Sequence, residues 1–167
     1  MERKEKHALQ KAVRTADEFA ASVKQIERLL FAASYAILSN SDVCADAVQA
    51  ALMKAWESRS SLRSGELFKS WMVRIVQNES RNLIRRKPNL PLDEDIPATE
   101  EDQARLDVKL ALSRLPEQTR LIVMLYYFER YPVKEICALL ELPEGTVHSR
   151  LSRAREQLRK ELTDYER

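Results

Sequence analysis

The sequence has little glycine and cysteine and no long apolar run. Two of its 167 residues are glycine and two are cysteine. Its longest apolar stretch, LIVMLYYF at residues 121–128, is far shorter than the roughly 20 residues that a membrane-spanning helix needs. The first ten residues, MERKEKHALQ, contain no apolar signal region. We therefore expect a cytoplasmic protein with no direct membrane insertion.

Residues suited to catalysis or metal binding are also scarce. Cys44 and Cys137 each fall on an apolar helical stripe, which favours small core residues over a disulfide or a redox switch. His7 and His148 share no metal-ligand spacing with these cysteines. The chain has no glycine-rich phosphate-binding loop and no motif that pairs a nucleophile with a base. These absences predict a protein without catalytic residues, cofactor or metal ion.

Charged residues make up 32% of the chain, and their signs are unevenly distributed. Residues 1–87 contain 16 Lys and Arg against 10 Asp and Glu, a net charge of +6. Residues 88–167 contain 12 against 16, a net charge of −4. The segment 88–102, PNLPLDEDIPATEED, holds three prolines and six carboxylates and has no helical period. This composition is typical of an extended linker between two domains.

Ahead of this linker, apolar residues recur at helical spacing in three segments. The first begins with Asp17 as its N-cap and continues without a break to Ile37. The second runs from about Asp42 to Glu57 and has an apolar inward face. An exposed methionine beside an acid and an amide suggests a surface for a partner protein. The outward face of this second segment carries those three residues: Asp46, Gln49 and Met53.

The third segment, residues 68–87, carries a second stripe beside its apolar face. An aromatic ring, amides and guanidinium groups share one sector of this helix: Trp71, Arg74, Asn78, Arg81, Asn82 and Arg85. Such groups can stack on bases, hydrogen-bond to base edges and neutralise phosphates. A core tryptophan with incidental surface arginines is the alternative interpretation. The pattern offers no explanation for Glu79, which falls near the middle of the apolar face.

After the linker, a short helix, a tight turn and a longer basic helix are predicted in order. VKEICALL at 133–140 forms the short helix, and Pro143 interrupts the helical pattern after it. GTVHSRLSRAREQL at 145–158 forms the longer helix, and Pro116 opens a further helix upstream. This order is that of a helix-turn-helix, which predicts a DNA-binding domain.

The longer helix has one apolar stripe surrounded by cations. Residues 145–160 contain five Lys and Arg against one Glu. Short polar residues and Arg153 lie opposite the apolar stripe, with cations on both sides of it. A helix of this kind suits a groove walled by phosphates. A solvated basic helix end is the alternative, because cations near a helix C-terminus also favour its dipole.

Together the two halves resemble the extracytoplasmic-function (ECF) sigma factors of bacterial RNA polymerase, in the sigma-70 family. ADAVQAALMKAW at 45–56 is similar to the family's core-binding helix, and FKSWMVRIVQNESRNLIRRK at 68–87 to its promoter-melting and −10-reading helix. Residues 112–158 are similar to region four almost throughout. The resemblance covers roughly residues 15–162, with both patterns in the family's order.

The resemblance implies a transcription initiation factor, not an enzyme, that binds core RNA polymerase and promoter DNA. The implied polymerase contacts are Asp46, Gln49 and Met53. The implied −10 contacts, with the loop at 59–69, are Trp71, Arg74, Asn78, Arg81, Asn82, Arg85 and Arg86. The implied base contacts at the −35 element are His148, Ser149, Ser152 and Arg153. The implied phosphate contacts there are Thr146, Arg150 and Arg155. An anti-sigma factor, membrane-linked or soluble, is the family's usual further partner.

We therefore predict an all-α protein of two small helical domains joined by an acidic, proline-containing linker. The predicted divisions are a flexible N-terminus (1–15), a region 2-like domain (16–87), the linker (88–102) and a region 4-like helix-turn-helix domain (103–167). A stand-alone helix-turn-helix regulator would not account for the stripe on the third segment. A helical adaptor or anti-sigma-like binder would not account for basic helices in both halves. An enzyme is the poorest match, because no catalytic motif is present.

Overall fold

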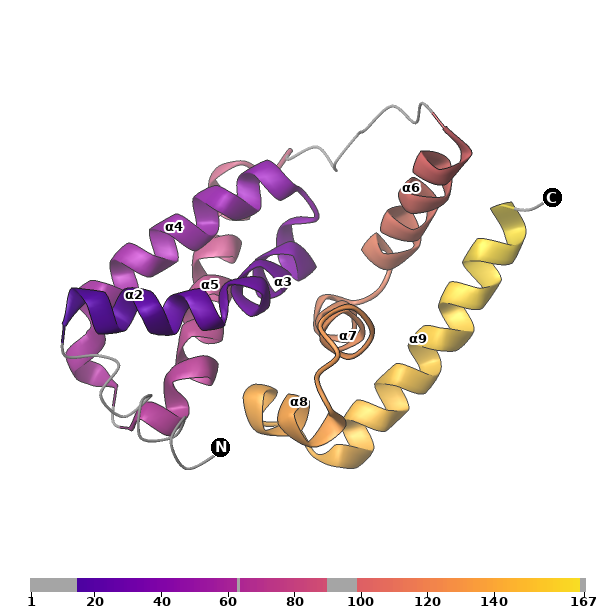
Figure 1. The fold of residues 1–167 in the computed structure, drawn as a ribbon. Coiled ribbons are helices and arrows are strands. Elements are labelled where there is room, and N and C mark those ends of the chain that lie inside the picture. The colour runs from indigo at the N-terminus through magenta and orange to yellow at the C-terminus, as the bar shows by residue number, and fades with distance from the viewer. Residues whose placement is uncertain (1–14, 63, 90–98, 166–167) are drawn as a thin grey trace.

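The computed structural model describes residues 15–62, 64–89 and 99–165, and within these ranges the chain forms helices and no strands (Figure 1). The all-α prediction is thus confirmed. The predicted flexible N-terminus, 1–15, lies outside the described residues except for its last residue. Most of the predicted linker, 88–102, lies outside them too, and the next helix begins within that span, at Glu100.

The N-terminal half packs three of its helices around a shared core. The largest fully buried side chains of this half include Phe68, Leu30 and Met72. Ser34 and Ser80 are buried among them, and their hydroxyl oxygens lie 2.9 Å apart. The elements of this half are α2 (Ala16–Gln25), α3 (Glu27–Leu38), α4 (Ser41–Glu57), the short 3-10 turns η1 (Arg59–Ser61) and η2 (Gly65–Leu67), and α5 (Phe68–Arg86).

The prediction of one continuous helix from Asp17 to Ile37 is wrong in two respects. Thr15 is the N-cap in place of Asp17, because its hydroxyl oxygen accepts a hydrogen bond from the Glu18 amide at 3.2 Å. The helix also breaks at Ile26, whose φ of −117° and ψ of 12° are not helical. The Ile26 side chain is nevertheless buried in the core. The apolar period therefore continues through the break and does not reveal it.

The small residues of α4 allow it to lie close against its neighbours. Its inward face is formed by fully buried Cys44, Ala47, Ala51 and Ala55. Helices α3 and α5 pack on α4. Cys44 is buried and Cys137 half-buried, and the two form no disulfide. The described structure thus agrees with core roles for both cysteines.

The C-terminal half contains the predicted helix-turn-helix. Its elements are α6 (Glu100–Ser113), α7 (Glu117–Val123), the π-helix η3 (Met124–Phe128), α8 (Val133–Leu140) and α9 (Glu144–Tyr165). The turn begins at Glu141, whose φ of 54° is left-handed, and the Leu142 amide donates to the Cys137 carbonyl at 3.1 Å. Ile136 of α8 and Val147 of α9 are fully buried. The order of short helix, turn and long helix is as predicted.

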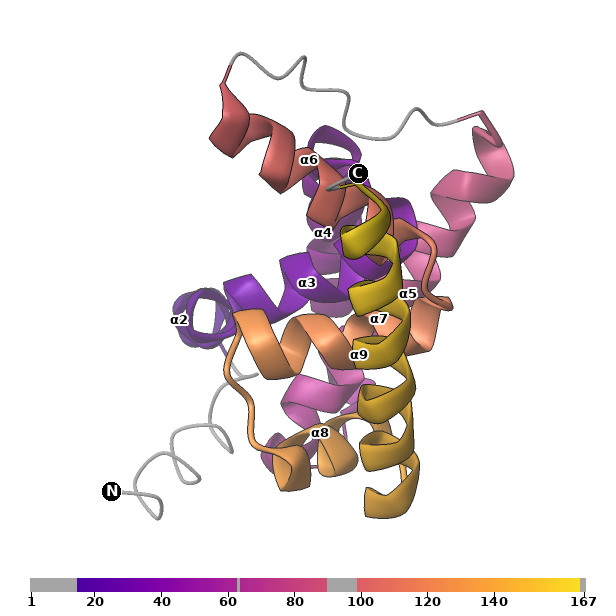
Figure 2. The ribbon, with the colours of Figure 1, turned by 90° about the vertical axis from the view of Figure 1, so that its right-hand side faces the viewer.

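The two halves pack against each other (Figures 1 and 2). Helix α3 contacts α7 and η3, and α5 contacts α8. One continuous cluster of buried side chains includes members of both halves, from Leu30 in α3 to Ile122 in α7. Helical periodicity did not predict this contact, because periodicity says which face of a helix is apolar but not what covers it.

Candidate functional site

The three predicted polymerase contacts share an open face of α4. Asp46, Gln49 and Met53 are all exposed, and Met53 is 64% exposed. They lie opposite the buried alanines that pack against α3 and α5. A large apolar side chain held in solvent beside polar groups can contribute to a protein interface. The structure thus leaves this face available to a partner.

The predicted stripe on α5 lies partly against the C-terminal half. Arg81 forms an ion pair with Glu117 of α7 at 2.6 Å, and Arg74 forms one with Glu141 in the helix-turn-helix turn. Asn78, between these arginines in the sequence, is exposed. The carboxylates that meet the two arginines both belong to the C-terminal half. Part of the stripe is therefore covered in this arrangement.

Trp71 lies at the boundary between the stripe and the core. It is half-buried and packs against the main hydrophobic cluster. Its ring centroid is 6.2 Å from that of Phe68, with the two planes tilted by 39°. Part of the Trp71 side chain therefore belongs to the core, as the alternative interpretation predicts. The rest of it is accessible beside Arg74.

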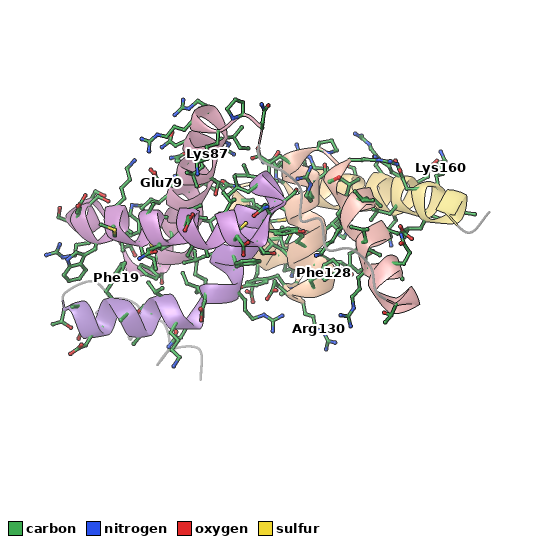
Figure 3. The ribbon with its side chains drawn as sticks, turned by 90° about the horizontal axis from the view of Figure 1, so that it is seen from above. Phe19, Glu79, Lys87, Phe128, Arg130 and Lys160 are labelled. Carbon is green, nitrogen blue, oxygen red and sulfur yellow. The ribbon has the colours of Figure 1, made fainter. Side chains whose placement is uncertain are left out.

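Glu79 is explained by a neighbour on α4. Glu79 lies on α5 (Figure 3). The Lys54 Nζ donates to its carboxylate at 2.6 Å, and the Asn82 amide nitrogen does so at 3.3 Å. The hydrogen bond from Lys54, followed by that from Asn82 and the charges of Lys54 and Arg86, holds the pKa of Glu79 below its ordinary value against the opposing effect of burial. The glutamate thus links α5 to α4 at the edge of the core.

The end of α5 is strongly basic and open. Arg85 donates to the side-chain oxygen of Asn82, which also contacts Glu79. Arg85 and Arg86 are both exposed in the last turn of the helix, where cations also favour the helix dipole. Both the oxygen and the nitrogen of the Asn82 amide are therefore hydrogen-bonded to residues of its own helix. Arg85 and Arg86 are more accessible than Asn82 to DNA.

The face of α9 opposite its apolar stripe, called the crest below, is open to solvent. Ser152 and Arg153 are exposed, opposite the buried Leu151 and Ala154. Within the ranges that the structure describes, Arg153 and Arg155 have no ion-pair partner. Both guanidinium groups can therefore reach a ligand without first leaving a carboxylate.

Other predicted residues of α9 already have intramolecular partners. Ser149 is half-buried, and its hydroxyl donates to the carbonyl of Thr146 at 3.0 Å. Arg150 donates to the side-chain oxygen of Gln118 in α7. His148 lies 3.5 Å from the Glu144 carboxylate, one turn earlier. Ser149 is thus less available as a base contact than Ser152.

Arg120 is a central residue that pattern analysis missed. It is only 9% exposed, and burial lowers the pKa of its guanidinium, with Glu117 and Tyr35 opposing that shift. Its guanidinium donates to the Leu112 carbonyl in the last turn of α6 at 2.8 Å, and to the Leu115 carbonyl just after that helix at 2.9 Å. Its position at the start of the apolar run 121–125 could have identified it, since an arginine there needs buried acceptors.

Arg120 also connects the two halves. The same guanidinium donates at 2.8 Å to the Ala36 carbonyl and at 2.8 Å to the Ser39 hydroxyl, both at the C-terminal end of α3. Ser39 has a left-handed φ of 50° as the C-cap of α3. One buried side chain therefore caps α3 and holds the turn before α7.

Two family models match the chain in the order of its two halves. The model of sigma-70 region 2 matches residues 23–88, and that of sigma-70 region 4 matches residues 105–158. The chain belongs to the sigma-70 family. The α5 stripe and the predicted polymerase contacts on α4 thus fall within region 2, and the helix-turn-helix falls within region 4.

Relatives with names of the ECF group cover most of the chain. It is 28% identical over 169 residues to the ECF RNA polymerase sigma factor SigW of Bacillus subtilis (strain 168), covering 89% of this chain and 90% of that one. It is 28% identical over 134 residues to the ECF RNA polymerase sigma-E factor of Escherichia coli (strain K12), covering 68% and 70%. The structure of CnrH in complex with the cytosolic domain of CnrY shares the fold, with a TM-score of 0.70 and 24% identity over 94% of this chain and 95% of that one.

As an ECF sigma factor, the protein is a transcription initiation factor and not an enzyme. It binds core RNA polymerase and directs it to promoter DNA. A stand-alone helix-turn-helix regulator is excluded, because region 2 precedes the helix-turn-helix. In the described part of the chain, no group of three or more His, Cys, Asp and Glu could hold a metal ion. Of the helices described, none has the length and apolarity needed to cross a membrane.

Proposed function

We propose that the sigma factor divides promoter recognition between its two halves. Residues 16–87 bind core polymerase and the −10 element, and residues 103–167 bind the −35 element. Residues 88–102 join them. The observation that carries this division is that each half presents its own basic helix, α5 or α9, with exposed arginines near polar side chains. The cytoplasm, where transcription takes place in bacteria, is the proposed location.

The −10 element is assigned to the α5 stripe together with the loop at 59–69. Arg85 and Arg86 neutralise phosphates, because both are exposed at the basic end of the helix. The accessible part of Trp71 offers a surface on which an unpaired base can stack. Asn78 is exposed on the same stripe and can hydrogen-bond to a base edge. Arg74, Arg81 and Asn82 complete the set once their present partners are exchanged.

The −35 element is assigned to α9. Arg153 and Ser152 form the exposed crest that enters the major groove, with His148 at its N-terminal side. Arg155 and Arg150 lie on opposite sides of the crest, where they meet phosphates of the two groove walls. Thr146 lies in the first turn of α9, near the helix N-terminus that favours a phosphate. Ser149 is a further base contact, once its hydroxyl leaves the Thr146 carbonyl.

Core polymerase is assigned to the outward face of α4. We expect Asp46→Arg combined with Gln49→Ala to weaken binding of core polymerase by about tenfold or more, since each lost central contact costs about 1 kcal/mol or more. The readout is pull-down of core polymerase by the full-length protein, with the helical circular dichroism spectrum as a folding control.

The chain offers a matched control on another helix. Gln103 and Asp107 are an amide and an acid one turn apart on α6, joined by a hydrogen bond of 2.9 Å. Asp107→Arg combined with Gln103→Ala introduces the same chemical changes in the other half and should leave polymerase binding unchanged. Equal loss in both double variants, or undiminished binding by the α4 variant, contradicts the assignment of this face.

Promoter recognition itself is tested by run-off transcription. Purified core polymerase is supplied with the protein and with a template library that is randomised upstream of a fixed transcribed sequence. We expect transcripts only in the presence of the sigma factor, with two enriched elements in the templates that produce them. Transcription of every template alike would contradict recognition by two separate DNA-binding surfaces.

An anti-sigma factor is a further proposed partner. One solved structure that shares this fold is a complex of this kind, that of the sigma factor RpoE with the anti-sigma factor NepR from Bartonella quintana. CnrH is likewise bound to a protein partner, the cytosolic domain of CnrY. A surface suited to an apolar partner is the groove of about 870 Å³ between α3, α6 and the end of η3, which Phe31 and Phe128 line. Both phenylalanines are exposed, by 39% and 51%.

A further inference from the structure

A chain of hydrogen bonds joins α4 to the basic end of α5. Lys54 of α4 donates to a Glu79 carboxylate oxygen at 2.6 Å. The Asn82 side-chain nitrogen donates to the same oxygen at 3.3 Å, and Arg85 donates to the Asn82 side-chain oxygen. Glu79, Asn82 and Arg85 follow one another at intervals of three residues, which places them along one side of the helix. Asn82 therefore lies between a carboxylate and a guanidinium.

These two neighbours allow the Asn82 amide only one orientation. An ionised carboxylate accepts hydrogen bonds and does not donate them, whereas a guanidinium donates and does not accept. The amide nitrogen must therefore face Glu79, and the amide oxygen must face Arg85. A flipped amide would place its oxygen against the carboxylate and its N–H groups against those of the guanidinium. Lys54 reinforces this orientation, because its hydrogen bond is the largest of the effects that keep the pKa of Glu79 low and its carboxyl group ionised.

The same orientation turns the amide oxygen toward solvent. Glu79 is the more enclosed neighbour, with 16% side-chain exposure, whereas Arg85 is exposed in the last turn of α5. Arg85 is assigned to promoter phosphates, and it leaves Asn82 when it turns to one. Glu79 is then the group that still holds the amide nitrogen. The Asn82 oxygen is left outward as a hydrogen-bond acceptor, with one N–H of the amide unused.

An outward acceptor distinguishes the bases by one exocyclic group. Adenine and cytosine carry an amino group, at N6 or N4, that donates, whereas guanine and thymine carry a carbonyl oxygen, O6 or O4, that accepts. An amide oxygen held outward accepts from the amino group but meets an unpaired carbonyl oxygen in the other two bases. An amide that is free to flip can bind either class. The choice between the classes therefore depends on what fixes the amide.

We propose that Glu79 is a positioning residue for promoter recognition: it fixes Asn82 as an acceptor, so that adenine or cytosine is selected over guanine or thymine at the facing base of the −10 element. This inference rests on the proposed assignment of Asn82 to the −10 element. Glu79 itself contacts no base and acts through the amide that it orients.

The experiment measures base preference at every position of the −10 element. Templates recovered from the promoter selection are randomised again within that element, and those retained in heparin-resistant complexes of core polymerase with the full-length protein are sequenced. We expect the parent to prefer adenine or cytosine by about fivefold or more at one position, and Asn82→Ala to remove that preference. Glu79→Gln should reduce it to about twofold or less, because a glutamine amide can donate or accept and no longer orients Asn82.

A rescue variant separates positioning from a purely structural role. Glu79→Gln combined with Asn82→Asp should restore the preference for adenine or cytosine, since an aspartate oxygen only accepts and needs no neighbour to orient it. A structural role alone would weaken binding to all −10 sequences alike and would not be rescued in this way. Circular dichroism confirms that each variant is folded.

The matched control is a glutamate that also holds a lysine. Glu156 of α9 accepts from Lys160 at 3.0 Å within its own helix. Glu156→Gln makes the same chemical change away from α5 and should leave every −10 preference as in the parent.

Three outcomes separate a failure of the Glu79 role from a failure of the −10 assignment. If Asn82→Ala leaves every position unchanged, Asn82 is not a base contact, and the assignment fails together with the proposal. If Asn82→Ala removes a preference that Glu79→Gln retains, the assignment stands and the role of Glu79 is wrong. If the preference that Asn82→Ala removes is for guanine or thymine, the amide oxygen does not face the base, and the proposed class of base is wrong.

Discussion

Helices α5 and α9 are both basic, yet the structure treats their arginines differently. Arg74 and Arg81 of α5 hold carboxylates from the other half of the chain. In the ranges described, Arg153 and Arg155 of α9 hold none. The comparison shows that composition identifies a basic surface but does not say whether that surface is open. Availability depends on what the rest of the chain places against it.

The difference also has a physical scale. The two ion pairs that cover α5 have exposed side chains, so each stabilises the contact between the two halves by about 1 kcal/mol at most. The buried Arg120 contact is of another kind, because its loss removes a donor from several buried carbonyls. The ion pairs on α5 are thus readily exchanged, whereas the Arg120 contact between α7 and α3 is firmly held.

The largest effect is expected from removing the Arg120 side chain, which tests whether the buried contact is the stronger of the two kinds. We expect Arg120→Ala to lower the free energy of unfolding by about 3–5 kcal/mol, because buried carbonyls of both halves lose their donor. Urea denaturation followed by circular dichroism measures the change. Arg159→Ala, at an exposed position of α9, is the control and should change stability by less than about 0.5 kcal/mol. Equal effects of the two substitutions would contradict a structural role for Arg120.

The next prediction concerns the exposed arginines of α9 and distinguishes base contacts from phosphate contacts. Arg153→Ala should relax sequence preference at one or two positions of the −35 element, since a bidentate arginine–guanine pair discriminates by about 1–3 kcal/mol. Arg155→Ala should instead weaken binding to all DNA sequences alike. It should also reduce the slope of log binding constant against log salt concentration by about one unit. Competition binding to a randomised −35 element at two salt concentrations measures both effects.

Arg150 is a less direct test than Arg155, because it first has to leave Gln118. If Arg153→Ala weakens every sequence equally while Arg155→Ala changes the preferred base, the orientation of α9 in the groove is wrong. Arg155 would then contact a base and Arg153 a phosphate.

The smallest expected effect concerns two glutamates that each hold a lysine. Hydrogen bonds from Lys54 to Glu79 on α5 and from Lys160 to Glu156 on α9 lower the pKa of both carboxyl groups. Glu79 is the more enclosed, with 16% side-chain exposure against 59% for Glu156. We expect Glu79→Gln to cost about 1 kcal/mol at pH 7, and Glu156→Gln to cost less.

The sign of the pH dependence follows from the lowered pKa. A carboxyl group with a lowered pKa in the folded state stabilises the fold above its unfolded pKa, and this contribution disappears as pH falls through the folded value. The difference between wild type and Glu79→Gln should therefore be constant above about pH 5 and shrink below the ordinary value of 4.5. Urea denaturation at pH 7 and at steps toward pH 3.5 measures it. A difference that grows as pH falls would contradict the Lys54 contact.

Much of the local structure follows from the sequence. The spacing of apolar residues places α4, α5, α8 and α9 and indicates which of their faces are buried. It also identifies the exposed outward face of α4 at Met53 and the exposed face of α9 at Arg153, because exposure on a helix follows from its period. The resemblance of both halves to sigma factors adds the order of the domains and the family. These features depend on residues that are close in the chain.

The tertiary structure alone decided the rest. The break at Ile26 leaves the apolar period intact, so only the packing of α2 and α3 reveals it. Glu79 looks misplaced until Lys54, 25 residues away, is found beside it. Arg120 reaches Ala36 across 84 residues. Local periodicity describes neighbours within a few turns, whereas buried polar groups need partners that chain folding brings from any distance. The same reason explains why only the structure shows the arginines of α5 covered by the other half.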